Sequence, residues 1–286
     1  MKKIFPLILL LIQFGAHAQS ITAFLDGADY IKDLKTGEAV PSWEIPDAPG
    51  IYGELSSRLF DSDQCVTFVR VSPCYYSIDI LCEERKNAGT TSSLCKKAGA
   101  VAGINGSYFN MSELTSITYV KDNGRVVTGT VMNEKFRTSG ILSICAGNPD
   151  IAADTTASGR AWEAIASGPI LIDDGRVITY GEGISGWDSF YNRRHPRSLV
   201  GIDGDGFLWL IVADGRSKGN ADGMTIDELT KLSALIGLTD ALNLDGGGSS
   251  TLWTEAGDVI NHPCDNRKFD HNGERVVPNA IAIIEK

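Results

Sequence analysis

Apolar residues in the chain gather into short stretches, rich in β-branched and aromatic side chains, that predict strands. CVTFVRVS (65–72) and YYSIDILC (75–82) are the first of these stretches. Further apolar stretches are separated by sequences rich in Asp, Asn and Gly, which are typical of hairpin turns. These turn sequences are Asp122-Asn123-Gly124, Asp173-Asp174-Gly175, Asp203-Gly204-Asp205-Gly206 and Glu255-Ala256-Gly257-Asp258. The pattern predicts an α+β fold with a mixed, largely antiparallel β-sheet core and a few packed helices.

One helix is predicted over 225–236. Thr225 and Glu228 have the spacing of a capping box, leucines recur on one face, and Gly237 follows as a stop signal. Shorter helices are expected at 92–98, closed by Gly99, and near 161–166.

The N-terminus has the pattern of a signal peptide. Lys2 and Lys3 precede an apolar run at 4–12 that is too short to span a bilayer, and Ala16-His17-Ala18 follows as a cleavage site. We therefore expect residues 1–18 to be a signal peptide, 19–63 an N-terminal extension and 64–286 the main domain. The protein is expected to be exported, to the periplasm or the exterior, with no transmembrane segment.

The net charge and the cysteines indicate which partners, disulfides and metal sites to expect. The 286 residues carry a net charge of −10. Removing the two lysines of residues 1–18 leaves 24 basic against 36 acidic side chains, or −12. This acidity argues against nucleic acid as a partner. The six cysteines of an exported chain predict structural disulfides, and no C-x-x-C pair supports a zinc site, so no metal is expected.

The stretch ALNLDGGGSSTLW (241–253) is the most unusual in the chain. Asp245 is followed by three glycines, which can take backbone angles closed to other residues, and then by three hydroxyl side chains. Successive amides in such a turn can form a concave nest for an anion. The alternative is a tight connection between two strands. A similar choice arises at Asn105-Gly106, where the spacing favours a hairpin turn over an amide presented to a ligand.

Other polar residues also stand at the ends of apolar strands. Ser167-Gly168 precedes ILID, Arg197 precedes LVGID, and Asp214-Gly215-Arg216 follows FLWLIVA. Polar groups at strand ends can converge on one edge of a sheet. Arginine binds phosphate oxygens bidentately, and a pair of aspartates suits glycosyl transfer to water. Sugar and phosphate chemistry is therefore the leading hypothesis, since the chain has no P-loop lysine, GxSxG or HExxH motif.

Several segments of the sequence resemble the phosphodiester glycosidase family. The matching segments are GINGSYFN (103–110), SGPILIDDG (167–175), HPRSLVGID (195–203), VADGR (212–216), GMTIDELTKLSALIGLTDALNLDGGGSSTLW (223–253) and VPNAIAI (277–283). The resemblance covers the chain from about Val101 to the C-terminus. The sequence departs from the family pattern at Ser107, where a second glycine is frequent, and at Ser198-Leu199, where Thr-Ala is common.

The resemblance implies hydrolysis of a sugar 1-phosphodiester, such as one of N-acetylglucosamine, to free sugar and a phosphomonoester, with no cofactor. The implied substrate is a phosphorylated glycan or sugar 1-phosphodiester. Two alternatives stay open: a non-catalytic carbohydrate-binding or envelope-assembly protein, and a phosphodiesterase that cleaves P–O. The catalytic candidates are Asp214, Asp245, Arg197 and Arg216. The substrate-binding candidates are Asn105, Gly106, Ser167, Gly168, Gly246, Gly247, Gly248, Ser249 and Ser250.

Overall fold

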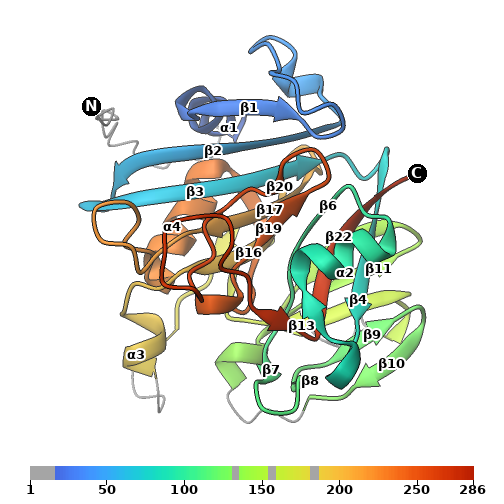
Figure 1. Cartoon of the computed structure of the whole chain (residues 1–286). Coiled ribbons are helices and arrows are strands. Elements are labelled where there is room, and N and C mark those ends of the chain that lie inside the picture. Colours follow the sequence, from blue (N-terminus) through green and yellow to red (C-terminus); the bar gives the residue numbers. More distant parts are fainter. Residues whose placement is uncertain (1–16, 131–134, 154–158, 181–186) are drawn as a thin grey trace.

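The computed structural model describes residues 17–130, 135–153, 159–180 and 187–286. Its core consists of antiparallel β-sheets with a few helices around them, so the predicted fold class is confirmed in outline (Figure 1). Every strand pair in these ranges is antiparallel, so the sheets are not mixed. The predicted signal peptide lies almost wholly on residues 1–16, outside the described ranges. Within those ranges, no helix is long and apolar enough to cross a membrane.

The largest sheet has eight strands in the order β1-β2-β3-β17-β16-β18-β14-β15. Its first two strands precede residue 63, so the N-terminal segment is built into the same sheet as the later strands. The strands are β1 (Tyr30–Asp33), β2 (Gly50–Leu59), β3 (Ser62–Val71), β14 (Ile170–Asp173), β15 (Arg176–Val177), β16 (Arg197–Asp203), β17 (Leu208–Ala213) and β18 (Leu238–Asn243).

Two five-stranded sheets lie beside it, in the orders β20-β19-β6-β22-β4 and β10-β9-β13-β11-β12. The first contains β4 (Tyr76–Cys82), β6 (Ala102–Asn105), β19 (Leu252–Thr254), β20 (Asp258–Val259) and β22 (Asn279–Glu285). The second contains β9 (Val120–Asp122), β10 (Arg125–Thr128), β11 (Gly140–Cys145), β12 (Asn148–Ala152) and β13 (Glu163–Ser167). Two short pairs join β5 (Gly89–Thr90) to β21 (Val276–Val277) and β7 (Phe109–Asn110) to β8 (Thr115–Ser116).

The helices cover the outer faces of these sheets. The α-helices are α1 (His17–Gly27), α2 (Thr91–Ala98), α3 (Trp187–Tyr191) and α4 (Ile226–Ile236). Short 3₁₀ turns are η1 (Ile45–Asp47), η2 (Arg85–Asn87), η3 (Lys135–Thr138) and η5 (Gly247–Ser249). Both hydrogen bonds of the predicted capping box are present at the start of α4, and Gly237 ends it in the left-handed region. The short helix predicted at 92–98 is confirmed as α2, which Gly99 ends in the same way.

Strand β17 is apolar throughout because both of its faces are buried. Leu208, Leu210 and Val212 face a core shared by all three sheets, while Trp209 and Ile211 face a second core beneath α1 and α4. Successive side chains of a strand point to opposite faces, so a strand buried on both faces has no polar positions.

The predicted hairpin turns are confirmed at all four places. Asn123-Gly124 and Asp174-Gly175 have positive φ at both residues, as a two-residue turn of this type requires. Asn105-Gly106 is different, because β6 pairs with β19 and β22 and not with the strand that follows it. The hairpin interpretation of that dipeptide was wrong.

Two further expectations are corrected. The helix expected near 161–166 is strand β13, which pairs with β9 and β11, so sheet pairing outweighs the helix propensity of its alanines. The six cysteines are all free thiols and form no disulfide. They lie on separate elements: Cys95, for example, packs in α2 against Trp253 and Ala282.

The turn at 203–206 is held by a buried carboxylate. Asp203 accepts hydrogen bonds from Trp209 Nε1 at 2.8 Å and from Arg70 Nε at 3.3 Å, and both charged side chains are almost fully buried. Replacing Asp203 with Ala would leave the Arg70 charge buried without its partner. We expect Asp203→Ala to lower the free energy of unfolding by about 3–5 kcal/mol in urea denaturation. Asp205→Ala, at an exposed position of the same turn, should change it by less than about 0.5 kcal/mol.

Candidate active site

The ends of neighbouring strands bring the predicted site residues to one edge of the eight-stranded sheet. Arg197, the first residue of β16, pairs with Ala213, so Asp214 follows directly beside it. On the other side of β16, Leu199 pairs with Asn243, two residues before Asp245. The convergence expected from the sequence is therefore present.

The segment before β14 reaches the same edge, because Ile170 pairs with Leu242 of β18. The carbonyl of Gly168 accepts hydrogen bonds from Tyr108 Oη at 2.6 Å and from Asn243 Nδ2 at 2.8 Å. Ser167 is fully buried. The Gly168 carbonyl therefore ties this segment to Tyr108 and Asn243.

Asn105 links the eight-stranded sheet to the five-stranded sheet that contains β6. Its Nδ2 donates to the carbonyl of Asp245 at 2.6 Å, and its Oδ1 accepts from Ser198 Oγ at 2.8 Å and from the amide of Thr251 at 3.2 Å. The carbonyl of Gly106 accepts from the amide of Asp245 at 3.1 Å. Asn105 is only 1% exposed, so its side-chain amide positions the glycine loop.

The three glycines of the loop run close to other backbone. A Cβ on Gly246 would lie 2.6 Å from the carbonyl oxygen of Pro196, which also accepts from the amide of Gly247. Gly247 has φ +66°, which disfavours other residues. The amides of Ser249 and Ser250 donate back into the loop. The amides of Gly247, Ser249 and Ser250 are therefore already bonded within the protein.

Two arginines lie against this loop. Arg216 Nη2 is 3.0 Å from the position that a Cβ on Gly247 would occupy, and the guanidinium of Arg275 would overlap a Cβ on Gly248. Arg275 also pairs with Asp265 at 2.6 Å. Glycine is thus required here because guanidinium groups pack against the backbone.

Asp245 is the half-buried carboxylate of the site. Burial raises the pKa of Asp245 to about 6, although the Ser249 hydroxyl and the positive charges of Arg275 and Arg137 act in the opposite direction. A carboxyl group with this pKa can exchange a proton near neutral pH.

Asp214 has very different surroundings. It is 1% exposed, and its Oδ1 accepts from Asn261 Nδ2 at 2.8 Å. Its Oδ2 is 3.0 Å from both the backbone nitrogen and Nδ1 of His262. Burial alone would lower the pKa of His262, but Asp214 raises it overall. Both oxygens of Asp214 thus hold the segment that follows β20.

Arg197 is also buried and bonded within the protein. Its Nε donates to the carbonyl of Met224 at 2.8 Å, and its Nη2 donates to the carbonyls of Phe190 and Arg193. Burial lowers the pKa of Arg197 to about 10. These contacts use the guanidinium to hold the wall of the site, formed by α3 and the segment after it.

Arg216 is exposed and faces the site from the turn after β17. Its Nη2 donates to His195 Nδ1 at 3.5 Å, and His195 Nε2 donates to the carbonyl of Ser189 at 3.0 Å. These bonds require the neutral imidazole. Burial lowers the pKa of His195, and the charges of neighbouring arginines lower it further.

Sequence reasoning missed Arg137, Arg275, Asn261 and His262. Arg137 follows residues outside the described ranges and packs over the rings of Tyr108 and Phe190, 5.3 and 4.6 Å from their centroids. The other three lie in the irregular segment after β20, where no periodicity marks them. An Arg or His in such a segment gives no signal in a single sequence.

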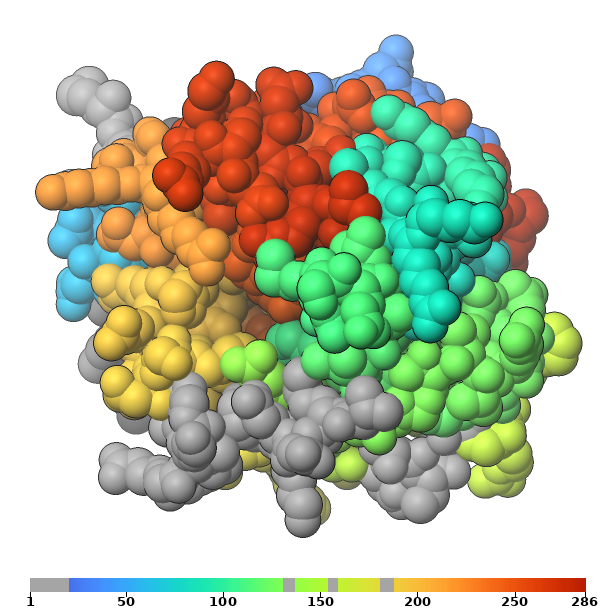
Figure 2. Space-filling model, turned by 60° about the horizontal axis from the view of Figure 1, so that its bottom comes forward, coloured from blue at the N-terminus to red at the C-terminus, as the bar shows by residue number. Residues whose placement is uncertain are grey.

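Figure 2 looks onto the face of the molecule that carries the candidate site. The surface is recessed between the yellow segment that contains α3, the orange turn after β17, the red segment after β20 and the green segment after β6. Arginines gather around this recess although the protein is acidic overall.

Known proteins are similar to this chain in sequence and in fold. A sequence profile of the phosphodiester glycosidase family matches residues 98–284. The chain belongs to the phosphodiester glycosidase family. The match contains every site candidate named above, from Asn105 to Ser250.

Curated mammalian relatives of this glycosidase-family chain are N-acetylglucosamine-1-phosphodiester alpha-N-acetylglucosaminidases. The mouse protein is 28% identical over 200 residues, which are 65% of this chain and 37% of that protein. The human protein is 27% identical over 249 residues, 79% of this chain and 47% of that protein. The chain thus spans between about a third and a half of the length of these relatives.

Solved structures show the same fold. The catalytic domain of the zebrafish N-acetylglucosamine-1-phosphodiester alpha-N-acetylglucosaminidase, auto-inhibited by its pro-peptide, matches with a TM-score of 0.66 at 16% identity and 83% coverage of both chains. A hypothetical protein from Synechocystis matches with a TM-score of 0.67 at 16% identity, covering 83% of this chain and 62% of its own.

The raised pKa of Asp245 makes stability depend on pH. The folded protein binds this proton more tightly than the unfolded chain, so stability is lost as pH rises from about 4 to 6 and the full cost is present above pH 6. Asp245→Asn removes the charge. We expect this variant to be more stable than the wild type at pH 7 by up to about 3 kcal/mol, and equally stable near pH 4. Urea denaturation across this range measures the difference.

The exposed Asp205 provides the control, since Asp205→Asn should follow the wild-type pH profile. A constant difference between Asp245→Asn and the wild type from pH 4 to 7 would contradict the assignment of the raised pKa to Asp245.

Proposed function

We propose that the protein is an exported hydrolase that cleaves the glycosidic bond of a sugar 1-phosphodiester, releasing free sugar and a phosphomonoester. Membership of the family and the names of the mammalian relatives support this reaction, with N-acetylglucosamine as the sugar. The basic and apolar N-terminal pattern supports export to the periplasm or the exterior.

One observation supports the proposal most directly: two guanidinium groups flank the glycine loop that carries the half-buried Asp245. Arg216 lies against Gly247, and Arg275 lies against Gly248. A sugar 1-phosphodiester presents an anion beside an anomeric carbon. Paired arginines next to a carboxylate suit both parts of that substrate.

The two arginines and Asp245 act on different parts of the substrate. A phosphomonoester leaves readily because its second pKa is about 6. Arg216 and Arg275 stabilise the charge on the departing phosphate, so little help from a general acid is needed. Asp245 serves the anomeric carbon, as nucleophile or as the base that activates water.

The remaining candidates position this machinery. Asp214 holds Asn261 and His262, and thereby the segment that carries Arg275. Arg197 holds the opposite wall through three carbonyls. Asn105 fixes the carbonyl of Asp245.

Replacing the reacting carboxylate should slow turnover without unfolding the protein. We expect Asp245→Asn to lower kcat by about 10²–10⁴-fold, the range for a side chain that moves a proton in the transition state. The assay is release of N-acetylglucosamine from an N-acetylglucosamine 1-phosphodiester at pH 7. Full turnover by this variant would exclude a catalytic role for Asp245.

Removing a phosphate-binding guanidinium should weaken substrate binding. Arg216→Gln loses a charged hydrogen bond of about 1.5–3 kcal/mol, so we expect kcat/KM to fall by roughly 10–100-fold. Arg267→Gln, at an exposed arginine of the segment after β20, is the matched control and should retain wild-type kinetics. Equal kinetics for the two variants would remove Arg216 from the phosphate site.

Product identification separates this function from the two alternatives. The proposed reaction yields free N-acetylglucosamine and a phosphomonoester. Cleavage of P–O would instead yield N-acetylglucosamine 1-phosphate. Saturable binding without product at high enzyme concentration would indicate a carbohydrate-binding protein.

A further inference from the structure

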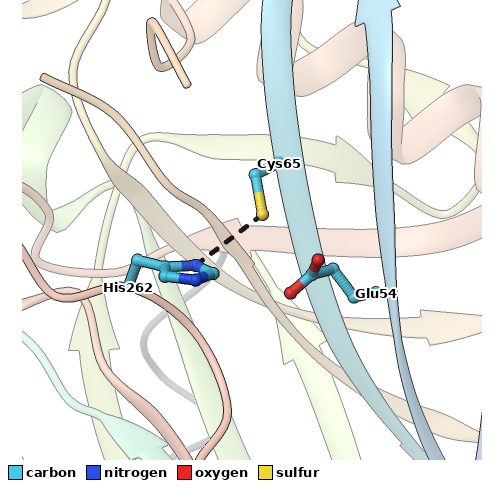
Figure 3. A group of neighbouring side chains, drawn as sticks. All are labelled: Glu54, Cys65 and His262. Carbon is cyan, nitrogen blue, oxygen red and sulfur yellow. Dashed lines mark hydrogen bonds between the residues drawn. The ribbon is translucent and has the colours of Figure 1, made fainter. Parts of the chain in front are cut away.

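Glu54, Cys65 and His262 bring a carboxylate, a thiol and an imidazole together beside Asp214. One ligand-type atom of each lies within 4.8 Å of the others. Cys65 Sγ is 3.9 Å from His262 Nδ1, and Figure 3 shows the Glu54 carboxylate turned toward the same space. The proposed reaction uses none of these three side chains.

The fold places these groups together from distant parts of the sequence. Ser56 of β2 pairs with Cys65 of β3, and Glu54 lies two residues before Ser56, so Glu54 and Cys65 are diagonal neighbours on one face of the sheet. His262 comes from the segment after β20. Its ring stacks on Phe269 with centroids 3.8 Å apart and planes 7° apart, which fixes its orientation.

The cluster is rich in acidic groups and poor in basic ones. Cys65 is 2% exposed, and Glu54 is half-buried. Among the described residues, no lysine or arginine forms an ion pair with Glu54 or Asp214; the ion pair of Asp214 is with His262. Buried carboxylates are normally compensated by a cation or a metal ion. A divalent cation would supply that compensation.

We propose that Glu54, Cys65 and His262 bind a zinc ion, with Asp214 as the fourth ligand. Ligand atoms around tetrahedral zinc lie roughly 3.3–3.6 Å apart, given Zn–N of about 2.0–2.1 Å and Zn–S of about 2.3 Å. Asp214 Oδ2 is 3.0 Å and Cys65 Sγ is 3.9 Å from His262 Nδ1, so small side-chain movements reach this geometry.

The types of ligand select the metal. Thiolate and imidazole favour zinc, whereas calcium and magnesium prefer sites made of oxygen alone. On binding, the thiol proton of Cys65 and the Nδ1 proton that His262 shares with Asp214 both pass to water, and His262 keeps its proton on Nε2 so that Nδ1 can ligate. No other reactant is needed.

A surface hollow lies near the cluster. His271 lines a surface hollow of about 330 Å³ together with Tyr30, and its ring centroid is 4.5 Å from that of His262. A bound ion would join the β2–β3 hairpin to the segment that carries Arg275. Its role is therefore to position that segment, and the proposed hydrolysis needs no chemistry from it.

A cysteine nucleophile fits the same residues less well. In such a site the histidine uses one ring nitrogen for the thiol and the other for the carboxylate. Here the same atom, His262 Nδ1, faces both Cys65 and Asp214. The buried thiol also has little access to a substrate.

Metal binding by the purified full-length chain tests the proposal. After treatment with a chelator and desalting, the wild type should retain about one zinc ion per chain when zinc is added back and free metal is removed. Cobalt(II) in place of zinc should give the charge-transfer absorption of a cobalt–thiolate bond. Cys65→Ser should lose this absorption and bind zinc at least about 100-fold more weakly.

Cys74→Ser is the matched control, because Cys74 is an exposed cysteine outside the cluster. It should retain both the zinc and the absorption.

If Cys65→Ser does not fold, Glu54→Gln replaces it and should weaken zinc binding while keeping the thiolate absorption at high cobalt concentration. Wild-type protein that retains no zinc, or Cys65→Ser that binds zinc as tightly as the wild type, would overturn the proposal. Neither readout depends on sugar release, so the result is separate from that for the proposed reaction.

Discussion

The hydrogen bonds of the Asn105 side chain fix the position of the site. They join the end of β6, in one five-stranded sheet, to Ser198 of β16 in the eight-stranded sheet and to the carbonyl of Asp245. A side-chain amide has both a donor and an acceptor, so a single buried residue can hold two sheets and a loop in one register. The carboxylate of Asp245 has a defined position because its own backbone is held in this way.

The glycine loop then determines what can gather around Asp245. Because Gly247 and Gly248 have no side chains, the guanidinium groups of Arg216 and Arg275 pack directly against the backbone. Burial nevertheless keeps the pKa of Asp245 near 6, so the charges of Arg275 and Arg137 compensate only part of the cost of desolvation. The site thus holds a destabilised carboxylate beside positive charge, an arrangement expected where function is selected over stability.

Local patterns predicted much of the fold and part of the site. The hairpin turns, the capping box of α4 and the gathering of Asp214, Asp245 and Arg197 at one sheet edge all follow from short-range sequence signals. The strand nature of β13, the free thiols and the inward role of Asn105 do not, because each depends on pairing or packing with residues far away in the sequence. Arg275 was missed for the same reason.

The two aspartates show where sequence reasoning stops. Asp214 and Asp245 both follow an apolar stretch and precede glycine, so the local sequence does not distinguish their roles. In the structure, Asn261 and His262 occupy both oxygens of Asp214, whereas Asp245 is half-buried among arginines. A carboxylate that is fully hydrogen-bonded within the protein is suited to holding a segment or a metal ion. One with a raised pKa in a recess is suited to a reacting centre. The same motif therefore supplies two different functions, and the surrounding long-range contacts decide which residue performs each.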